Sequence, residues 1–172
     1  NEVKKAMANP ISCNMLEIVG IEFIDDNLNE VKHKIKDLEF LILSQNKNNS
    51  FSFHENLKDQ KEIFEMRKAG LNILMSLRGD KKPVAFIEDC AVSLDHLADY
   101  TSRLKEVFKK YNTSGMFYAH ASVGTLHVRP IINMKSEQDI KNMRSITEEA
   151  FQMVKEYKGA HSGEHGDGIL RS

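Results

Sequence analysis

The chain has 172 residues, a length typical of a single domain. Hydrophobic residues make up 41% of the sequence and charged residues 28%, which favours a packed core over disorder. The 24 basic residues nearly balance the 25 acidic ones, so the composition argues against a nucleic-acid partner. No apolar run approaches the roughly 20 residues of a membrane span. The two cysteines, Cys13 and Cys90, are too few for a disulfide framework, and we expect a cytoplasmic protein.

Hydrophobic periodicity predicts the elements of the first half of the chain. In chain order we expect a helix over 28–38, a buried strand over 40–43, a strand over 51–53 and a helix over about 56–77. Asn27 with Glu30 is typical of a helix start, because the two side chains can bond the first free backbone amides. The polar segment 46–50 predicts a turn between the two strands.

The second half predicts more strands and two strongly amphipathic helices. In chain order we expect a strand over 84–87, a helix capped by Ser93, strands over 116–120 and 126–132, and a helix capped by Ser136. We interpret the apolar stripes of these helices, which include Leu94 and Ile140, as core. The mixed order predicts an α+β fold over 1–172, a single domain with helices packed on a mainly antiparallel sheet.

The strands around 121–125 bring two histidines within reach of each other. A hairpin whose paired residue numbers sum to 247 would place His120 directly opposite His127, with both rings on one face. Two neutral imidazoles can bind one divalent ion, and Arg129 would lie on the same face. Packing or hydrogen bonding is the alternative interpretation, and a register slip of one residue would separate the two rings.

The glycine-rich segment 162–168 is the second unusual feature. It lacks the ending of a Walker loop, so a phosphate cradle is not expected. Glu164 could supply a third metal ligand, and His165 has the intrinsic pKa, about 6.5, of a proton acceptor near neutrality. Asp167 could orient that imidazole or cap a turn. The alternative is a flexible, solvated turn.

The segments 118–130 and 162–168 together resemble the C-terminal domain of FAD-linked oxidases, the D-lactate, glycolate and D-2-hydroxyglutarate dehydrogenase group. The segments 66–71 and 83–92 look like the long subclass, in which a flavin module is fused to an iron–sulfur module. The resemblance implies a substrate or cap domain with ferredoxin-like pieces.

The resemblance also implies a role for each candidate residue. His120, His127 and Glu164 would bind a divalent metal (Zn, Mn or Fe), His165 would be the general base, and Arg67, Arg129 and Thr125 would bind substrate. The implied reaction is oxidation of a D-2-hydroxy acid to a 2-oxo acid, with hydride transfer to FAD. Thr125 stands where many relatives have Asn, and the segment Glu88-Asp89 stands where some have a lysine.

The residues contain no dinucleotide-binding pattern, so we expect the chain to be a piece of a larger flavoenzyme that is inactive alone. The expected partners are an FAD-binding module, an iron–sulfur module, a small 2-hydroxy acid and a second copy of the chain. Contact with the inner membrane would come only through electron-transfer partners. The alternatives are a standalone metal-binding or hydrolytic protein, or an inactive remnant.

Overall fold

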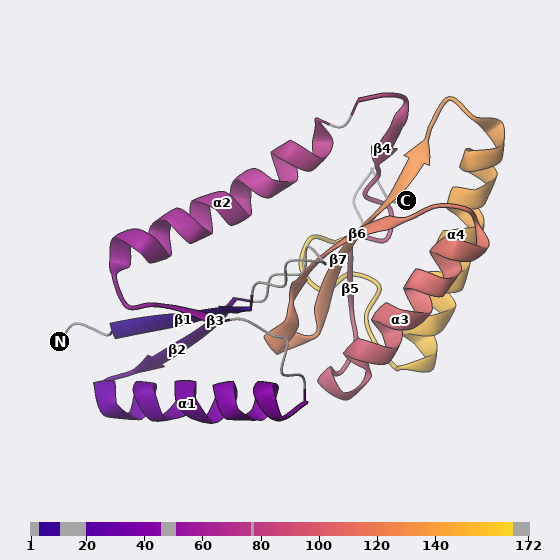
Figure 1. Cartoon of the computed structure of the whole chain (residues 1–172). Helices are drawn as coiled ribbons and strands as arrows, with labels where there is room; N and C mark the ends of the chain where they lie inside the picture. The colour runs from indigo at the N-terminus through magenta and orange to yellow at the C-terminus, as the bar shows by residue number, and fades with distance from the viewer. Residues whose placement is uncertain (1–3, 11–19, 46–50, 77, 167–172) are drawn as a thin grey trace. The chain divides into compact units, whose positions relative to one another are not determined.

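The computed structural model describes residues 4–10, 20–45, 51–76 and 78–166 (Figure 1). By its Cα positions the chain divides into two compact units, Asn1–Leu71 (unit 1) and Asn72–Ser172 (unit 2). Both combine helices with antiparallel strands, which confirms the predicted α+β class. In the described part of the chain, no helix is both long and apolar enough to cross a membrane.

Unit 1 is built on a three-stranded antiparallel sheet in the order β2-β1-β3. Its elements are β1 (Lys4–Pro10), β2 (Ile21–Asp25), α1 (Leu28–Gln45), β3 (Phe51–His54) and most of α2 (Leu57–Met75). The central strand β1 pairs with both neighbours, and α1 packs against β2 and β1. The predicted strand over 51–53 and the helix over about 56–77 are confirmed, whereas the predicted turn at 46–50 lies outside the described residues.

The start of α1 is as predicted, but its length is not. The side-chain oxygen of Asn27 accepts a hydrogen bond of 2.9 Å from the backbone N–H of Asn29, which caps the helix. The predicted strand over 40–43 is wrong, because these residues continue α1 to Gln45 and Phe40 is 77% exposed. A short apolar run fits a strand or a helix equally well, and here the half-buried Leu38 and Ile42 keep the helical spacing.

Unit 2 is built around one long strand. Its elements are β4 (Lys81–Pro83), β5 (Asp89–Ala91), α3 (Leu94–Lys110), β6 (Gly115–His120), a 3-10 turn (Ala121–Val123), β7 (Thr125–Asn133) and α4 (Glu137–Glu156). β7 pairs antiparallel with β6 and also with β4 and β5, which meet different halves of β7. α3 and α4 pack against each other, and α4 packs on β7 (Figure 1).

The predicted strand over 84–87 is wrong, although its side chains are core. The segment is a bend between β4 and β5. The backbone N–H of Val84 bonds the carbonyl of Pro130, the next residue in the β4–β7 register, but Pro130 has no N–H to continue the ladder. Phe86 and Ile87 are nonetheless buried, at 6% and 1% exposure. Burial of an apolar run therefore misled the strand prediction, because burial does not require a ladder of hydrogen bonds.

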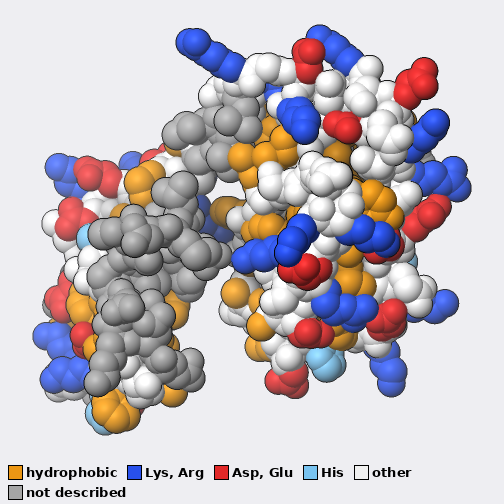
Figure 2. Space-filling model, turned by 45° about the vertical axis from the view of Figure 1, so that its right-hand side comes forward, with side chains coloured by type: hydrophobic (Ala, Val, Ile, Leu, Met, Phe, Trp, Pro, Cys, Tyr) orange, Lys and Arg blue, Asp and Glu red, His pale blue; other side chains and the backbone are white. Residues whose placement is uncertain are grey.

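The core of unit 2 lies between the sheet and the two helices. Its large buried side chains include Tyr100, Leu104, Phe108, Val128, Ile132, Ile146 and Val154. Two predicted core residues, Leu94 and Ile140, are exposed, because each lies in the first turn of its helix, beyond the packed region. Ser136 caps α4 through Asp139 N–H as predicted, while Ser93 precedes α3 without a side-chain cap bond. The outer face of the unit carries interspersed acidic and basic side chains (Figure 2).

The side chains of β7 alternate between the two faces of the sheet, and this alternation determines which face presents the candidate functional residues. Leu126 and Val128 point into the core under the helices, at 4% and 0% exposure. Because side chains alternate along a strand, Thr125, His127 and Arg129 point to the opposite face. We call this second face the site face.

Candidate metal and substrate site

The β6–β7 hairpin places two imidazoles together, but in a different register from the one predicted. His120 pairs with Thr125, and His127 pairs with Tyr118, so the predicted pairing of His120 with His127 is wrong by two residues. The 3-10 turn 121–123 and Gly124, whose φ is 72°, take up residues that the prediction assigned to the ladder. A shift of two residues keeps both rings on one face. Their centroids lie 5.2 Å apart.

Residues 161–166, here the site loop, bring a carboxylate to these imidazoles. Glu164 Oε1 lies 3.7 Å from His120 Nε2, and Glu164 Oε2 lies 3.6 Å from His127 Nε2. The loop is held against β5, where the backbone N–H of Gly163 bonds the carbonyl of Asp89 at 2.8 Å. Side chains from β6, β7 and the loop after α4 therefore converge on one point of unit 2.

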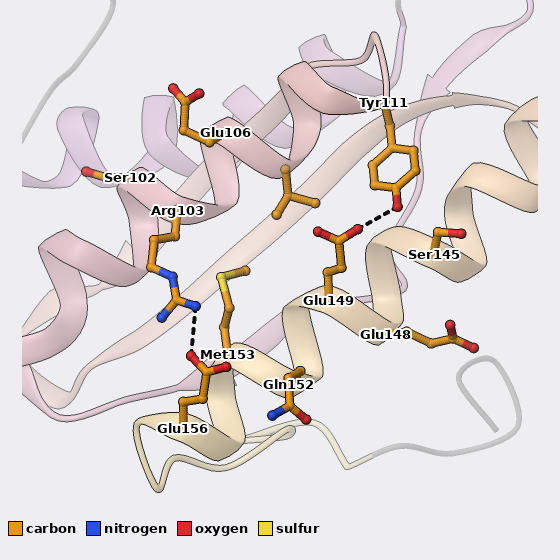
Figure 3. Close-up of a pocket in the computed structure, with 11 residues that line it drawn as sticks. Ser102, Arg103, Glu106, Tyr111, Ser145, Glu148, Glu149, Gln152, Met153 and Glu156 are labelled. Carbon is orange, nitrogen blue, oxygen red and sulfur yellow. Dashed lines mark hydrogen bonds and ion pairs between the residues drawn. The ribbon is translucent and has the colours of Figure 1, made fainter.

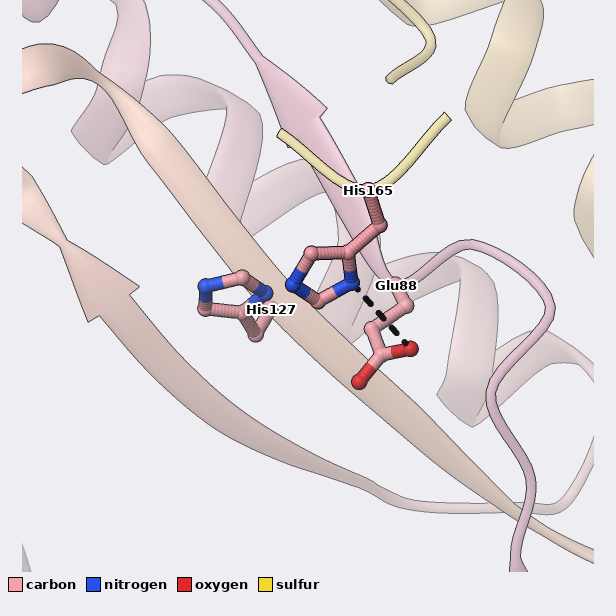
Figure 4. Close-up of side chains that lie close together, drawn as sticks. All are labelled: Glu88, His127 and His165. Atoms are coloured by element: carbon pink, nitrogen blue, oxygen red, sulfur yellow. Dashed lines mark ion pairs between the residues drawn. The ribbon is translucent and has the colours of Figure 1, made fainter. Parts of the chain in front are cut away.

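His165 lies beside this cluster and is 43% exposed. Its ring stacks on His127 with centroids 5.3 Å apart, and its Nε2 lies 3.6 Å from Glu164 Oε2. Its Nδ1 faces Glu88 Oε2 at 3.8 Å, so the imidazole lies between His127 and Glu88 (Figure 4). An exposed imidazole with a carboxylate behind it is suited to accept a proton from a small ligand. Asp167, considered as its orienting partner, lies outside the described residues.

His127 is the buried member of the cluster, at 8% exposure. Burial lowers the pKa of His127, and the carboxylate of Glu164 opposes this effect only in part. The imidazole is therefore held in the neutral form, which is the form that binds metals. Among the described residues, nothing forms a hydrogen bond with His127 Nδ1, although this atom is buried. A buried imidazole nitrogen without a partner is costly, so Nδ1 is suited to a bound water, whereas Nε2, which faces Glu164, is the nitrogen on the side of the cluster.

The donor set of the cluster fits a divalent metal. One ligand atom each from His120, His127 and Glu164 lies within 4.8 Å of the other two. Ligand atoms about 2.0–2.2 Å from one tetrahedral ion are about 3.4 Å apart, close to the observed nitrogen–oxygen separations of 3.6 and 3.7 Å. Two imidazoles and one carboxylate form a three-ligand set that leaves a position open for a substrate.

A second group of potential ligands shares His127 with the first. Glu88, His127 and His165 also offer three atoms within 4.8 Å of one another. The carboxylate of Glu88, however, is paired with the guanidinium of Arg129. A metal at this second group would have to compete with that fixed positive charge. The first group therefore fits a metal better.

The three predicted substrate-binding residues differ in their placement. Arg129 lies on the site face and is paired with Glu88. Thr125 is also on this face but is only 3% exposed, and a side chain at Gly163 would lie 3.1 Å from its hydroxyl. The site loop therefore covers Thr125. Arg67 belongs to α2 in unit 1, where it is exposed, whereas the clustered residues belong to unit 2.

Sequence reasoning missed three residues of the site. Glu88 meets Arg129 and His165, and Asp89 accepts hydrogen bonds from the site loop. Tyr118 packs edge-on against His120, with ring centroids 5.7 Å apart. All three lie inside segments that carried the family resemblance. Tyr118 lies two residues before His120 on the predicted strand, so alternation could have placed it on the same face, whereas the spacing of Glu88 and Asp89 to the histidines gave no hint of contact.

A groove of about 770 Å³ lies elsewhere in unit 2, between α3 and α4 (Figure 3). Two of its acidic side chains already have partners within the groove. Arg103 bonds Glu156 at 2.7 Å, and Tyr111 donates a hydrogen bond of 2.5 Å to Glu149. No histidine is among the described residues that line this groove, so we place the functional site on the site face.

Comparisons with known proteins show the family of the chain. The chain is 27% identical over 154 residues to D-2-hydroxyglutarate dehydrogenase of Haemophilus influenzae and 29% identical over 160 residues to that of Pantoea ananatis, matches that cover 87% and 90% of the chain. It is 26% identical to glycolate oxidase subunit GlcD of Bacillus subtilis, over 64% of the chain and 23% of that protein. The chain spans only 15% and 16% of the two dehydrogenases. A family model described as FAD linked oxidases, C-terminal domain, matches residues 2–172, so the chain belongs to this family.

Proposed function

We propose that the chain is the substrate- and metal-binding domain of an FAD-dependent dehydrogenase that oxidises a D-2-hydroxy acid to the 2-oxo acid. The convergence of His120, His127 and Glu164, with His165 beside them, carries the proposal. Relatives named D-2-hydroxyglutarate dehydrogenase, glycolate oxidase subunit and D-lactate dehydrogenase support the same substrate class.

In this proposal His120, His127 and Glu164 hold a divalent ion, with Zn, Mn and Fe as candidates. When bound, the flavin supplies a hydride acceptor for the α-carbon, and the cation supplies a Lewis acid for the substrate hydroxyl. His165 accepts the hydroxyl proton at Nε2, the nitrogen on the side of the ligand cluster.

The substrate carboxylate would be bound by guanidinium groups, which pair with carboxylates through two parallel hydrogen bonds. Arg129 is positioned for this on the site face, and we propose Arg67 as a second contact. We propose Thr125 as a third contact, since its hydroxyl lies on the site face, where the site loop covers it.

The partners that we propose are an FAD-binding module and an iron–sulfur module, in the same or a companion chain, and a second copy of this chain. The chain matches only 15% and 16% of the length of two relatives, which supports further modules in the complete enzyme. We place the enzyme in the cytoplasm, with membrane contact only through its electron acceptors. The chain alone should neither bind FAD tightly nor oxidise a hydroxy acid.

Two measurements test the proposal. The first titrates the chain with Co²⁺, which takes the place of the unidentified divalent ion, and follows visible absorption. We expect one Co²⁺ per chain, with weaker binding in Glu164→Gln and His120→Ala. His96→Ala is the matched control, because His96 lies on α3, where it stacks on Tyr157 with centroids 5.0 Å apart, on the other side of the sheet from the cluster.

The second measurement uses a chimera in which this chain replaces the matched segment of the Haemophilus influenzae relative. We expect the chimera to reduce a dye with D-2-hydroxyglutarate, glycolate or D-lactate, and Glu164→Gln to lose this activity. Oxidation by the chain alone would contradict the proposal. Zinc-dependent ester hydrolysis without flavin would favour a hydrolytic protein instead, because two imidazoles and a carboxylate can also activate water. A protein that binds neither metal nor hydroxy acid would favour an inactive remnant.

A further inference from the structure

Asp89 stands apart from the other carboxylates of the site because it is almost completely buried, at 1% exposure. It begins β5 and pairs with His127 across the β5–β7 ladder. Residues directly opposite each other in an antiparallel pair point to the same face of the sheet. Its side chain therefore lies on the site face, next to the buried imidazole of the cluster.

A single oxygen of Asp89 holds the site loop. Oδ2 accepts hydrogen bonds from the hydroxyl of Ser162 at 2.9 Å, from the backbone N–H of Glu164 at 3.0 Å and from the backbone N–H of His165 at 2.8 Å. The last two donors belong to the residues whose side chains complete the cluster. Hydrogen bonds to a buried, charged acceptor are about twice as strong as neutral ones.

Backbone hydrogen bonds also hold the start of the loop, and the residue before it, against β5. Ala91 and Ala160 exchange two hydrogen bonds of 2.9 Å, and Gly163 N–H bonds the Asp89 carbonyl. These contacts fix where the loop leaves the sheet edge. They do not include the amides of Glu164 or His165, so the orientation of these two residues depends on the Asp89 carboxylate.

We propose that Asp89 is a positioning residue that holds Glu164 and His165 over the two imidazoles, so that the metal-binding set is preformed. The inference deepens the proposed function and rests on it for the metal. Asp89 itself is buried under the loop and does not act on the substrate. Residues that orient metal ligands commonly contribute a factor of about 10–100 to metal affinity.

The experiment compares Asp89→Ala, Asp89→Asn and Ser162→Ala with the unmodified 172-residue chain. We expect Asp89→Ala to weaken Co²⁺ binding about 10–100-fold, Asp89→Asn to weaken it less because an amide oxygen still accepts, and Ser162→Ala to weaken it least. If Asp89→Ala does not fold, the other two variants keep the same order. Asp139→Ala is the matched control, because Asp139 also accepts a backbone N–H, that of Asn133 at 2.9 Å, but at the end of β7, six residues along the strand from His127.

A double-mutant cycle separates positioning from general stability. If Asp89 acts by orienting Glu164, Asp89→Asn should not weaken Co²⁺ binding further in a Glu164→Gln background. Equal losses in both backgrounds, or wild-type Co²⁺ affinity in both Asp89 variants, would overturn the proposal.

Amide hydrogen exchange tests the positioning without any metal. We expect Asp89→Asn to speed exchange at the amides of Glu164 and His165 by on the order of tenfold, with no such change at Ala160, whose bonds to Ala91 remain. Unchanged exchange at Glu164 and His165 would overturn the proposal. If the unmodified chain binds no Co²⁺, the proposed metal site is wrong, and the exchange result still decides whether Asp89 positions the loop.

Discussion

The guanidinium of Arg129 is paired with the carboxylate of Glu88, and the two side chains are 23% and 9% exposed. Arg129 is also the residue that we predict from the sequence to bind the carboxylate of a substrate. An external anion must therefore compete with Glu88 for the same guanidinium, or approach a site whose positive charge is already balanced. This relationship leads to the first prediction.

Glu88→Gln should make the chain bind small carboxylates better. The change removes the competing charge and leaves Arg129 without a full partner, so the variant should be less stable and should regain stability when an anion binds. D-lactate should then raise the melting temperature of Glu88→Gln more than that of the parent. Asp80→Asn, which breaks the exposed pair with Lys135, is the control and should show no such gain. Equal responses to D-lactate would mean that Glu88 does not restrict Arg129.

His165→Ala should separate proton transfer from metal binding. If the metal is held by His120, His127 and Glu164, the variant chain should keep Co²⁺ affinity close to that of the parent. Turnover of the chimera should fall about 10²–10⁴-fold, the usual contribution of a general base. If Co²⁺ binding is lost as well, and is also lost in Glu88→Gln, the metal belongs to the second group of ligands.

Gly124→Ala should destabilise unit 2, because this residue closes the hairpin that carries both imidazoles. Its φ is 72°, and an added Cβ would lie 1.9 Å from the carbonyl oxygen of Val92. We expect a loss of roughly 1–3 kcal/mol in the free energy of unfolding, measured with urea. Gly79→Ala is the control, since its φ of 96° is also positive but its surroundings are open. Equal losses would mean that the backbone conformation, not the contact with Val92, determines the cost.

The helices and the faces of β7 could be predicted because they depend on local patterns. The capping residues Asn27 and Ser136 and the alternation along 125–129 are properties of short segments. The hairpin register could not be obtained in the same way. It depends on a turn at Gly124 that accepts a hydrogen bond from Val92, and nothing near the turn in the sequence reveals this partner.

In the site, too, the features set by local sequence patterns could be predicted, and those set by distant partners could not. The closeness of His120 and His127 followed from strand periodicity. Glu164 followed as a third ligand from the glycine-rich segment 162–168, and the family resemblance implied the same role. The structure brings these three together as expected. The parts played by Glu88 and Asp89 depend on the pairing of β5 with β7, which sets Asp89 opposite His127 although they are far apart in the chain. A three-residue strand after a buried bend carries too little pattern to predict that pairing.

Glu149 gives a prediction about stability and pH that is independent of the proposed activity. Its carboxylate accepts hydrogen bonds from Lys110 at 2.7 Å and from Tyr111 at 2.5 Å, linking α4 to the end of α3. The bond from Lys110, followed by that from Tyr111, lowers the pKa of Glu149 below its ordinary value of 4.5. A lowered pKa in the folded state means that the charged carboxylate stabilises the fold above that ordinary value, and that this contribution is lost as the pH falls through the folded-state pKa.

Glu149→Gln should therefore be less stable than the parent at pH 7, and the two proteins should converge in acid. Urea unfolding at a series of pH values measures the difference. Because the bond with Glu149 raises the pKa of Lys110, the pair should persist into alkaline solution and weaken only as Lys110 loses its proton. Glu148→Gln is the control, since it removes the same charge from the same helix but breaks only an exposed pair with Arg144. The contrary result is that the free energies of unfolding of Glu149→Gln and the parent differ by the same amount at every pH. That result would show that the shape of the Glu149 side chain, not its charge, accounts for its contribution.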